Sequence, residues 1–452
     1  MVQLVAHRLV RLSRPTEHVP RDHPYRTRAN VAVAVWAGTI TIGVALGLIL
    51  RAFGRDILLL PPILAELGPG PRPNLVLPIA TAVALILALP RLAERLRWHA
   101  LLATVALMTL VWTMSLALAE GVSGLTRGLT WPTEYLSDVP AVRAAPGAFL
   151  RGFTRDIGNY SVHARGHPPG MVLLLAALDR GGLGGAGWAA AMILGAAATA
   201  PVAVMLALRD VAGETIARRS APWLVLAPAA IWVATSADAL YMAVGAWAVA
   251  LVILATGRRG RSAAVLALLG GLLAGFVLLG SYGLVLLAAI PLASIWSRRE
   301  HRWAAARTVL LAGAGAMIVL AALLPFGYSW LAGARATKHE YYLQDLDRPY
   351  WALLVVNLAA WALALGPATF VALAHLRDRR IWWLVGGGIA AAALANLSGL
   401  SAGEVERIWL PFTIWVLPAG AAFPRSGHTT RTGLTLQAAS AIALISIVTT
   451  QW

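Results

Sequence analysis

The chain has 452 residues, of which 59% are hydrophobic and 13% are charged, and its formal net charge is +17. A soluble domain carries about 25% charged residues, so this composition excludes an ordinary soluble fold. The arginines stand between hydrophobic runs rather than on one polar face, which favours a role in membrane topology over nucleic-acid binding. The lack of cysteine excludes disulfides, thiolate metal ligands and cysteine nucleophiles.

Apolar runs of about 20 residues recur along the chain, and each is long enough to cross the hydrocarbon core of a bilayer. They do not alternate with period two, so they predict helices rather than barrel strands. The expected fold class is an all-α polytopic membrane protein with about 13 transmembrane helices. In chain order, the expected spans are 30–50, 74–89, 99–118, 186–208, 219–234, 239–256, 262–280, 283–297, 304–324, 352–374, 381–399, 407–422 and 432–449.

Arginine-rich connections alternate with arginine-poor ones along the chain, so the arginine-rich connections all lie on one side of the membrane. Their charge marks this side as the cytoplasmic face. That face includes the N-terminal tail, 1–29, which lacks the features of a cleavable signal. The opposite, extracytoplasmic face holds a long loop, 119–185. Two apolar segments in this loop, 145–153 and 168–178, are too short to span and suit helices lying on the membrane surface. We therefore expect a multi-pass protein of the plasma membrane with its N-terminus in the cytoplasm.

The first candidate catalytic residue is Glu120, which ends the third span in the string Leu-Ala-Glu-Gly. A carboxylate at the edge of a hydrophobic helix is partly desolvated, which raises its pKa and strengthens it as a base. The alternative is an interfacial acid that only marks the end of the helix.

Two further candidate carboxylates, Glu134 and Asp138, follow in the same loop. They are spaced i, i+4, so on a helix they would share one face. Such a pair could hold a divalent metal or a sugar. The alternative is a solvated loop without a ligand.

The most informative string is Tyr-Ser-Val-His-Ala-Arg-Gly-His-Pro-Pro-Gly, residues 160–170. Its Pro-Pro pair rigidifies the start of a short apolar helix. Arg165 close to a helix N-terminus suits a phosphate. His163 and His167 could bind metal, hydrogen-bond a diphosphate or donate a proton.

Other candidate substrate-binding residues lie farther along the same face. Asp238 sits between two spans, where it could also cap the following helix. The loop after residue 326 mixes aromatic and charged side chains, which suit a sugar or a lipid head group but also an interfacial belt. The candidates here and in the neighbouring short loop are Tyr282, Lys338, Arg348 and Tyr350.

The last cluster is Glu404, Glu406 and Arg407, immediately before a hydrophobic span. Arg407 lies on the extracytoplasmic face, against the positive-inside trend. It could pair with either glutamate, or it could clamp a lipid phosphate.

Together these features resemble the GT-C superfamily of integral-membrane glycosyltransferases, which use polyprenyl-phosphate sugars. The resemblance rests on a span that ends in an acid, a long outer loop, His167-Pro-Pro-Gly, the later Ser-Ala-Asp238, and Glu404-x-Glu-Arg-x-Trp409. It covers residues 99–422, a catalytic transmembrane module that follows two extra helices within 30–98 and precedes a C-terminal loop and helix, 423–452. Within actinobacteria the chain looks similar to the methylthioxylose transferase-like group.

The resemblance implies roles for several candidates. The family places a catalytic base just after the opening helix of the first large outer loop, which corresponds to Glu120, although Asp is usual there. Glu134 and Asp138 are the other candidates for the base. The resemblance also implies that Arg165, His167 and Arg407 lie near the lipid phosphate.

We therefore expect sugar transfer from a polyprenyl-phosphate donor to an envelope glycan or lipid acceptor, with inversion at the anomeric carbon. The expected partners are the donor, the acceptor and the lipid bilayer, without nucleic acid. No cofactor is required by these residues, and a divalent metal is compatible with them. The alternatives are a transporter or flippase of a lipid-linked or anionic substrate, and a non-catalytic scaffold. Apolar mid-span positions and the lack of an evident internal repeat argue against a transporter.

Overall fold

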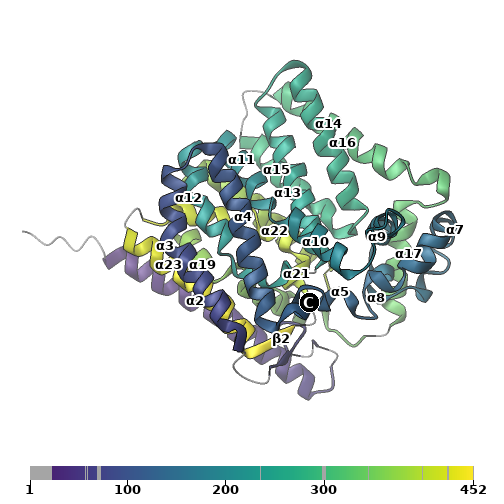
Figure 1. The fold of residues 1–452 in the computed structure, drawn as a ribbon, viewed down its shortest axis with the longest axis horizontal. Coiled ribbons are helices and arrows are strands. Elements are labelled where there is room, and N and C mark those ends of the chain that lie inside the picture. The colour runs from purple at the N-terminus through teal and green to yellow at the C-terminus, as the bar shows by residue number, and fades with distance from the viewer. Residues whose placement is uncertain are drawn as a thin grey trace, which may run out of the picture.

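The computed structural model describes residues 23–55, 57–58, 60–68, 73–234, 236–297, 302–344, 346–399, 401–424 and 427–450. Most of the expected N-terminal tail lies outside these residues. The described chain is a bundle of helices with one two-stranded sheet (Figure 1).

Eight described helices are long and apolar enough to cross a membrane. A helix of 20 residues is about 30 Å long, which matches the hydrocarbon thickness. The all-α multi-pass expectation is confirmed, whereas 13 spans are not found among the described residues. The eight are α2 (His23–Ala52), α3 (Val76–Arg95), α4 (Trp98–Ala117) with its short extension, α10 (Ala186–Ala197) continued by α11 (Ala200–Ala212), α13 (Ala237–Thr256), α14 (Gly260–Leu278), α16 (Arg302–Ala321) and α20 (Arg379–Leu397).

Three expected spans, 219–234, 283–297 and 407–422, are not single long helices. They are replaced by shorter α-helices and 3-10 helices, and η6, α22 and η10 have a proline as their first or second residue, which cannot donate a hydrogen bond to a preceding turn. The segments are α12 (Glu214–Val225) with η6 (Pro228–Trp232), η7 (Tyr282–Ala288) with α15 (Ala289–Ser297), and α21 (Val405–Ile408) with α22 (Leu410–Thr413) and η10 (Leu417–Ala422). Apolar runs of the right length therefore overestimated the number of spans.

The expected span 352–374 is broken. Helices α18 (Tyr350–Leu365) and α19 (Pro367–His375) meet at an angle of 91°. Gly366 joins them with a φ of +76°, which favours glycine, and a Cβ there would lie 2.2 Å from Gln437 Oε1. Gln437, on α23 (Gly427–Ile447), donates to Leu365 O at 2.9 Å and accepts from Ala368 N at 3.1 Å. The amide side chain thus satisfies backbone groups that the bend exposes.

The long loop 119–185 is folded into short helices, as expected. The expected surface segments 145–153 and 168–178 correspond to α7 (Pro146–Gly152) and α9 (Gly170–Arg180). On the right of Figure 1 these helices lie with α8 (Val162–Gly166) and with α17 (Trp330–Leu343). The other loop elements are η2 (Leu118–Glu120), η3 (Val122–Leu125), α5 (Arg127–Thr130), η4 (Tyr135–Ser137), α6 (Val139–Ala144), η5 (Ile157–Asn159) and α8 (Val162–Gly166).

The two ends of the described chain pack together. Strand β1 (Ala65–Leu67) pairs antiparallel with β2 (Val448–Thr450), with Ala65 opposite Thr450. Helix α2 packs on α18, where Trp36 Nε1 donates to Ala362 O at 2.9 Å. The helices before residue 98 are therefore part of the same bundle. The remaining elements are η1 (Pro73–Leu75) and η9 (Leu324–Phe326).

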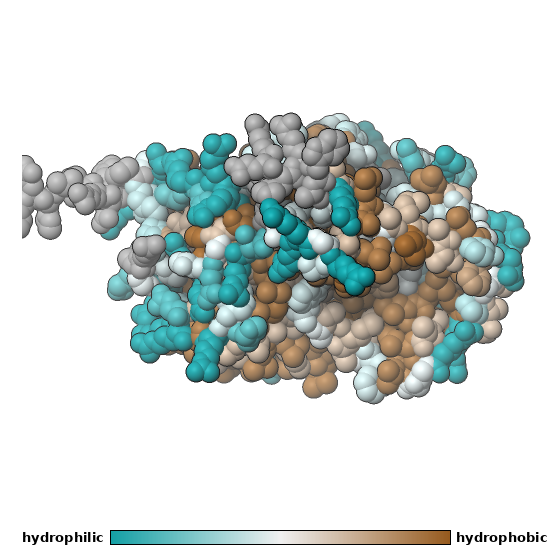
Figure 2. All heavy atoms as spheres, turned by 90° about the horizontal axis from the view of Figure 1, so that it is seen from above, coloured by the Kyte–Doolittle hydropathy of each residue, from teal (hydrophilic) through white to brown (hydrophobic). Residues whose placement is uncertain are grey.

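Burial places α13 at the centre of the bundle. In the most apolar stretch of α13, 72% of the residues are buried, whereas in the corresponding stretch of the span that contains α16 only 6% are buried. Large apolar side chains on the outer helices are exposed, including Ile42, Leu107 and Leu310. Figure 2 shows apolar side chains over much of one face, with polar side chains along its left and right margins. Exposed apolar helices around a buried centre indicate a multi-pass protein in a lipid bilayer.

Candidate functional site

A buried charged cluster forms around Arg407, whose side chain comes from α21. Arg407 Nη1 lies 2.5 Å from Asp238 Oδ2, in the first turn of α13. Its Nη2 lies 2.7 Å from His163 Nε2, on α8, and also contacts the Glu404 carboxylate. Arg407 is 5% exposed, so these contacts are made away from water. We call Glu134, His163, Asp238, Glu404 and Arg407 the buried cluster.

Local structure explains how Asp238 and Glu404 reach Arg407. Ser236 caps α13 by accepting a hydrogen bond from the Asp238 backbone N at 3.2 Å. Because Ser236 fills the capping role, the Asp238 carboxylate is available to Arg407. Glu404 adopts a left-handed conformation with a φ of 57° directly before α21. This turn places its carboxylate beside a side chain only three positions later.

The hydrogen bonds of His163 fix its tautomer. Arginine has no acceptor, so His163 Nε2 accepts from Arg407 and carries no proton. Nδ1 lies 3.0 Å from Thr133 O and 3.2 Å from Glu134 Oε1, both of which are acceptors. Nδ1 therefore carries the proton. Burial, followed by the charge of Arg407, lowers the pKa of His163 to about 3, so the ring is neutral at physiological pH.

Glu134 completes the cluster from the loop before η4. Its side chain is buried, and this burial raises its pKa to about 7, although the charge of Arg407 acts in the opposite direction. A carboxyl group with this pKa exchanges its proton near neutral pH. That property suits a general acid or base.

His167 lies next to the buried cluster, with its ring centre 6.2 Å from that of His163, but it is more exposed than His163. Its Nδ1 lies 3.0 Å from His163 O, so Nδ1 donates and Nε2 carries the lone pair. Within the described ranges no hydrogen-bond partner is found for Nε2, and the residue is partly exposed. Burial of the ring lowers the pKa of His167, which keeps the lone pair available.

The His-Pro-Pro-Gly string fixes this histidine by backbone contacts. Gly170 N donates to Leu279 O at 2.8 Å, which anchors the start of α9 to the end of α14. A Cβ at Gly170 would lie 2.3 Å from the same oxygen, so the close approach requires glycine. The string is thus needed for packing as well as for its side chains.

Arg407 is electrically compensated within the buried cluster. It contacts two carboxylates, those of Asp238 and Glu404. Of the two pairings expected from the sequence, Glu404 is found, whereas no ion pair joins Glu406 to Arg407 among the described residues. Glu406 is fully buried, and this burial raises its pKa to about 8. The geometry therefore gives Arg407 the role of a buried ion-pair partner.

Glu120 lies in a different environment. Its carboxylate pairs with Arg127, and both line a small pocket together with Thr450. The buried cluster is built instead from η4, α8, α13 and α21 and the residues beside them. Glu120, the expected base, is therefore paired with Arg127 and not with Arg407, the arginine at the centre of the buried cluster.

Glu134 and Asp138 do not share a helix face. They flank the 3-10 helix η4, and Glu134 has an extended backbone. Asp138 accepts from Ser161 N at 3.1 Å, whereas Glu134 is directed to His163. The i, i+4 argument was wrong because this segment is not an α-helix.

Arg165 joins the loop to α17. Its Nη1 lies 3.3 Å from Glu340 Oε1, a long contact, and its buried Nε has no hydrogen-bond partner among the described residues. Thr337 donates to Arg165 O at 3.0 Å. Arg165 therefore keeps donor capacity close to His167.

The remaining candidates make backbone and aromatic contacts around the site. Arg348 donates to Ala402 O at 3.0 Å, next to the Glu404 turn. Tyr350 donates to Leu397 O at 2.6 Å, and Tyr282 lies 3.1 Å from the Tyr328 hydroxyl. Lys338 lies 6.0 Å from the centre of the Tyr342 ring. The first three contacts join segments that are distant in the sequence, whereas Lys338 and Tyr342 lie on the same helix, α17.

Sequence reasoning missed two tyrosines beside the cluster. Tyr135 and Tyr241 are fully buried, and the Tyr135 ring centre lies 5.8 Å from that of His163. Tyr241 follows Asp238 by three residues on α13, so its helical spacing could have signalled the same face.

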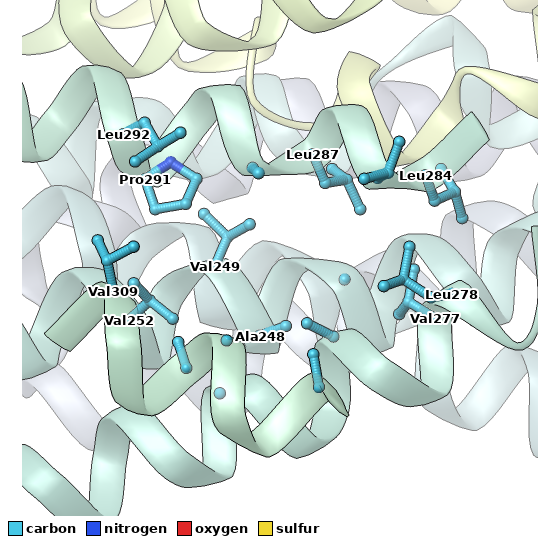
Figure 3. A pocket seen from close by; sticks show the side chains of 18 of the residues that line it. Ala248, Val249, Val252, Val277, Leu278, Leu284, Leu287, Pro291, Leu292 and Val309 are labelled. Carbon is cyan, nitrogen blue, oxygen red and sulfur yellow. The ribbon is translucent and has the colours of Figure 1, made fainter. Parts of the chain in front are cut away.

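An apolar cavity of about 240 Å³ lies between α13, α14, η7, α15 and α16, and some of its lining side chains, such as Val285 and Leu292, are exposed. Figure 3 shows Val249 and Val252 of α13 facing Leu284, Leu287 and Pro291 across this space. No group of three or more side chains in the described residues is arranged to hold a metal ion. The site is therefore an ionisable cluster with an apolar cavity nearby.

Comparison with protein-family models, with curated proteins and with solved structures finds no match.

Proposed function

We propose that the chain is a GT-C-like glycosyltransferase that moves a sugar from a polyprenyl-phosphate donor to an envelope glycan or lipid acceptor at the extracytoplasmic face. One observation carries the proposal. Segments far apart in the sequence bring Glu134, His163, Asp238 and Arg407 into one buried cluster at one end of the central helix. Ionisable groups are costly at such a position and mark functional sites.

The acceptor hydroxyl needs a base, and Glu134 is the best-placed group. Its pKa of about 7 allows a large deprotonated fraction at neutral pH. His163 presents its Nδ1 proton 3.2 Å from the carboxylate, which holds the deprotonated form in place. The acceptor oxygen attacks the anomeric carbon, its proton passes to Glu134, and the bond to the phosphate oxygen breaks. Polyprenyl phosphate leaves, and the anomeric centre is inverted.

The departing phosphate needs positive charge, and Arg165 suits this role better than Arg407. Arg407 already contacts two carboxylates and acts as a positioning residue for Asp238, Glu404 and His163. Arg165 is held by one long contact to Glu340, and its Nε donor is unused within the described residues. His167 Nε2 lies on the same loop and can accept from a sugar hydroxyl.

The apolar cavity is suited to the first part of the donor's lipid chain. Along α13, Asp238, Gly245, Val249 and Val252 are spaced i, i+7, i+11 and i+14, so they share one helix face. The cavity begins at Gly245, about 10 Å along the helix axis from Asp238. One face of α13 therefore runs from the charged cluster to this apolar cavity, the lining of which is drawn in Figure 3.

The test is a transfer assay with the purified protein, acceptor membranes and a panel of radiolabelled polyprenyl-phosphate sugars. Glu134→Gln should lower transfer at least about 100-fold, the usual range for loss of a general base. The control is Asp179→Asn, because Asp179 pairs with Arg143 elsewhere in the loop. Loss in Glu120→Gln, with Glu134→Gln unimpaired, would move the base to Glu120. Failure with every donor would remove the proposal.

A second candidate function, transport or flipping of a lipid-linked or anionic substrate, is favoured by the broken pair α18 and α19. Broken helices with satisfied backbone groups are typical of transporters. Reconstituted vesicles with a fluorescent lipid-linked sugar would separate the two functions. Movement across the bilayer without formation of a glycosylated product would favour the transporter.

A further inference from the structure

A second groove lies at the end of the bundle far from the buried cluster. It has a volume of about 500 Å³ and is formed between α15 and the first turns of α20. Helix α20 starts at Arg379 and ends at Leu397, so it separates its two ends by about 27 Å. The segment after Leu397 leads to Ser401 and the Arg407 cluster. The groove therefore belongs to the opposite side of the membrane from the proposed active site.

The polar groups of this groove are all hydrogen-bond donors. Arg379 makes no hydrogen bond or ion pair with any residue that the structure describes, and neither does the indole N–H of Trp383. The neighbouring arginine is different, since Arg380 makes a bidentate contact with Asp378 at 2.7 and 3.1 Å. The indole N–H of Trp382 also has a partner, because it donates a hydrogen bond to Leu376 O at 3.0 Å. Arg379 is exposed, so the groove offers unused donors, one of them charged, that suit an acceptor of negative charge.

The rest of the groove is apolar and made of small residues. Ala289 and Ala293 of α15 face Gly386, Gly387 and Ala390 of α20. Gly387 is the contact point of the two helices, because a Cβ there would lie 2.8 Å from Ile290 Cα. Gly386 opens into the groove, and a Cβ there would meet only Trp382, at 3.7 Å. The small side chains leave a groove of about 500 Å³ beside the helix pair, a volume that suits part of a hydrocarbon chain.

We propose that this groove binds one anionic phospholipid, with its phosphate on Arg379 and Trp383 and an acyl chain along the glycine and alanine floor. The ligand must be amphiphilic because the donors lie at the end of an otherwise apolar channel. It must be anionic because a zwitterionic head group brings its own cation next to Arg379. A lipid is the source of the phosphate because the groove faces the surface of spanning helices. This site does not depend on whether the protein transfers or transports a sugar.

The test uses the purified full-length chain and native mass spectrometry with phosphatidylglycerol or phosphatidylcholine of the same acyl chains. One phosphatidylglycerol should be retained with a preference of about tenfold, in line with a charge-assisted contact. Arg379→Gln should abolish the preference. Arg380→Gln is the matched control. It removes the same charge from the neighbouring position, but Arg380 is already paired with Asp378. Soluble glycerol phosphate at millimolar concentration should not displace the lipid.

Gly386→Leu tests the channel separately. A leucine here fills the groove without the backbone clash expected at Gly387, and thermal unfolding checks that the fold is kept. It should reduce lipid retention about as much as Arg379→Gln does. Equal retention of both lipids, equal effects of Arg379→Gln and Arg380→Gln, full retention in Gly386→Leu, or displacement by glycerol phosphate would each overturn the proposal.

Discussion

The guanidinium of Arg407 and the carboxylate of Asp238 lie 2.5 Å apart, although 169 residues separate them in the chain. Their contact joins the start of the central helix α13 to the short helix α21. Both side chains are more than nine-tenths buried. A buried pair of this kind is costly to break, because removal of either partner leaves the charge of the other partner buried and uncompensated.

Replacing Arg407 with glutamine should destabilise the protein by about 3–5 kcal/mol, the range for a buried ion pair that loses one partner. Asp238 and Glu404 would then face each other without a cation. The double variant Arg407→Gln, Asp238→Asn should recover part of this loss, because one uncompensated charge is removed. Unfolding in detergent micelles, followed by circular dichroism, measures the four states of the cycle. Strictly additive losses would show that the pair is not coupled.

If Glu134 is the base, the rate of sugar transfer should depend on pH. Its pKa of about 7 means that the deprotonated, active form increases between pH 6 and 8, and the rate should rise about tenfold over this interval. His163, with a pKa lowered to about 3, stays neutral throughout and adds no second limb. Initial rates in buffers of constant ionic strength provide the measurement. A flat profile in the wild type would exclude Glu134 from the proton transfer.

Glu406 should make the stability of the protein decrease with pH. Its folded pKa of about 8 lies above the ordinary value of 4.5, so the folded state binds more protons than the unfolded state between these values. The stabilisation is therefore complete below pH 4.5 and is lost as the pH rises through 8. Wild type should lose more stability between pH 5 and 8.5 than Glu406→Gln, by up to about 4 kcal/mol. Parallel melting curves for the two proteins would contradict this.

Gly170→Ala should destabilise the loop much more than Gly166→Ala. The added Cβ would press on Leu279 O at 2.3 Å and weaken the hydrogen bond that anchors α9, at a cost of about 1–3 kcal/mol. A Cβ added at Gly166 would meet no described atom within 4 Å, so its substitution serves as the control. Limited proteolysis of the outer loop and thermal unfolding compare the two. Similar behaviour would show that the His-Pro-Pro-Gly string does not need glycine for packing.

The long helices were predicted well from the sequence, because an uninterrupted apolar run of about 20 residues is what a helix needs to cross the hydrocarbon core. The sequence-based prediction failed where prolines divide such runs, as in the segments that contain Pro228, Pro411 and Pro418. It also missed the sharp bend at Gly366. That bend depends on a hydrogen-bonding partner, Gln437, about 70 residues away, which no local pattern reveals.

For the candidate site, residue type was more informative than spacing. Arg407, expected on the extracytoplasmic face against the positive-inside trend, and the acid Asp238 were both singled out from the sequence, but their contact with each other was not anticipated. Glu120 was preferred for its place at a helix end, whereas the structure pairs it with Arg127. The i, i+4 reasoning for Glu134 failed because spacing carries information only when the segment is an α-helix.

The pairing of β1 with β2 has a consequence for biosynthesis. Strand β2 leaves the ribosome long after β1, yet it pairs with residues 65–67 and its Thr450 O accepts from Arg127 at 3.1 Å. Until residues 448–450 have been synthesised, β1 lacks this partner strand and the wall of the pocket around Glu120 is incomplete. Helices inserted earlier must therefore wait for this distant segment before the contact between β1 and β2 can form.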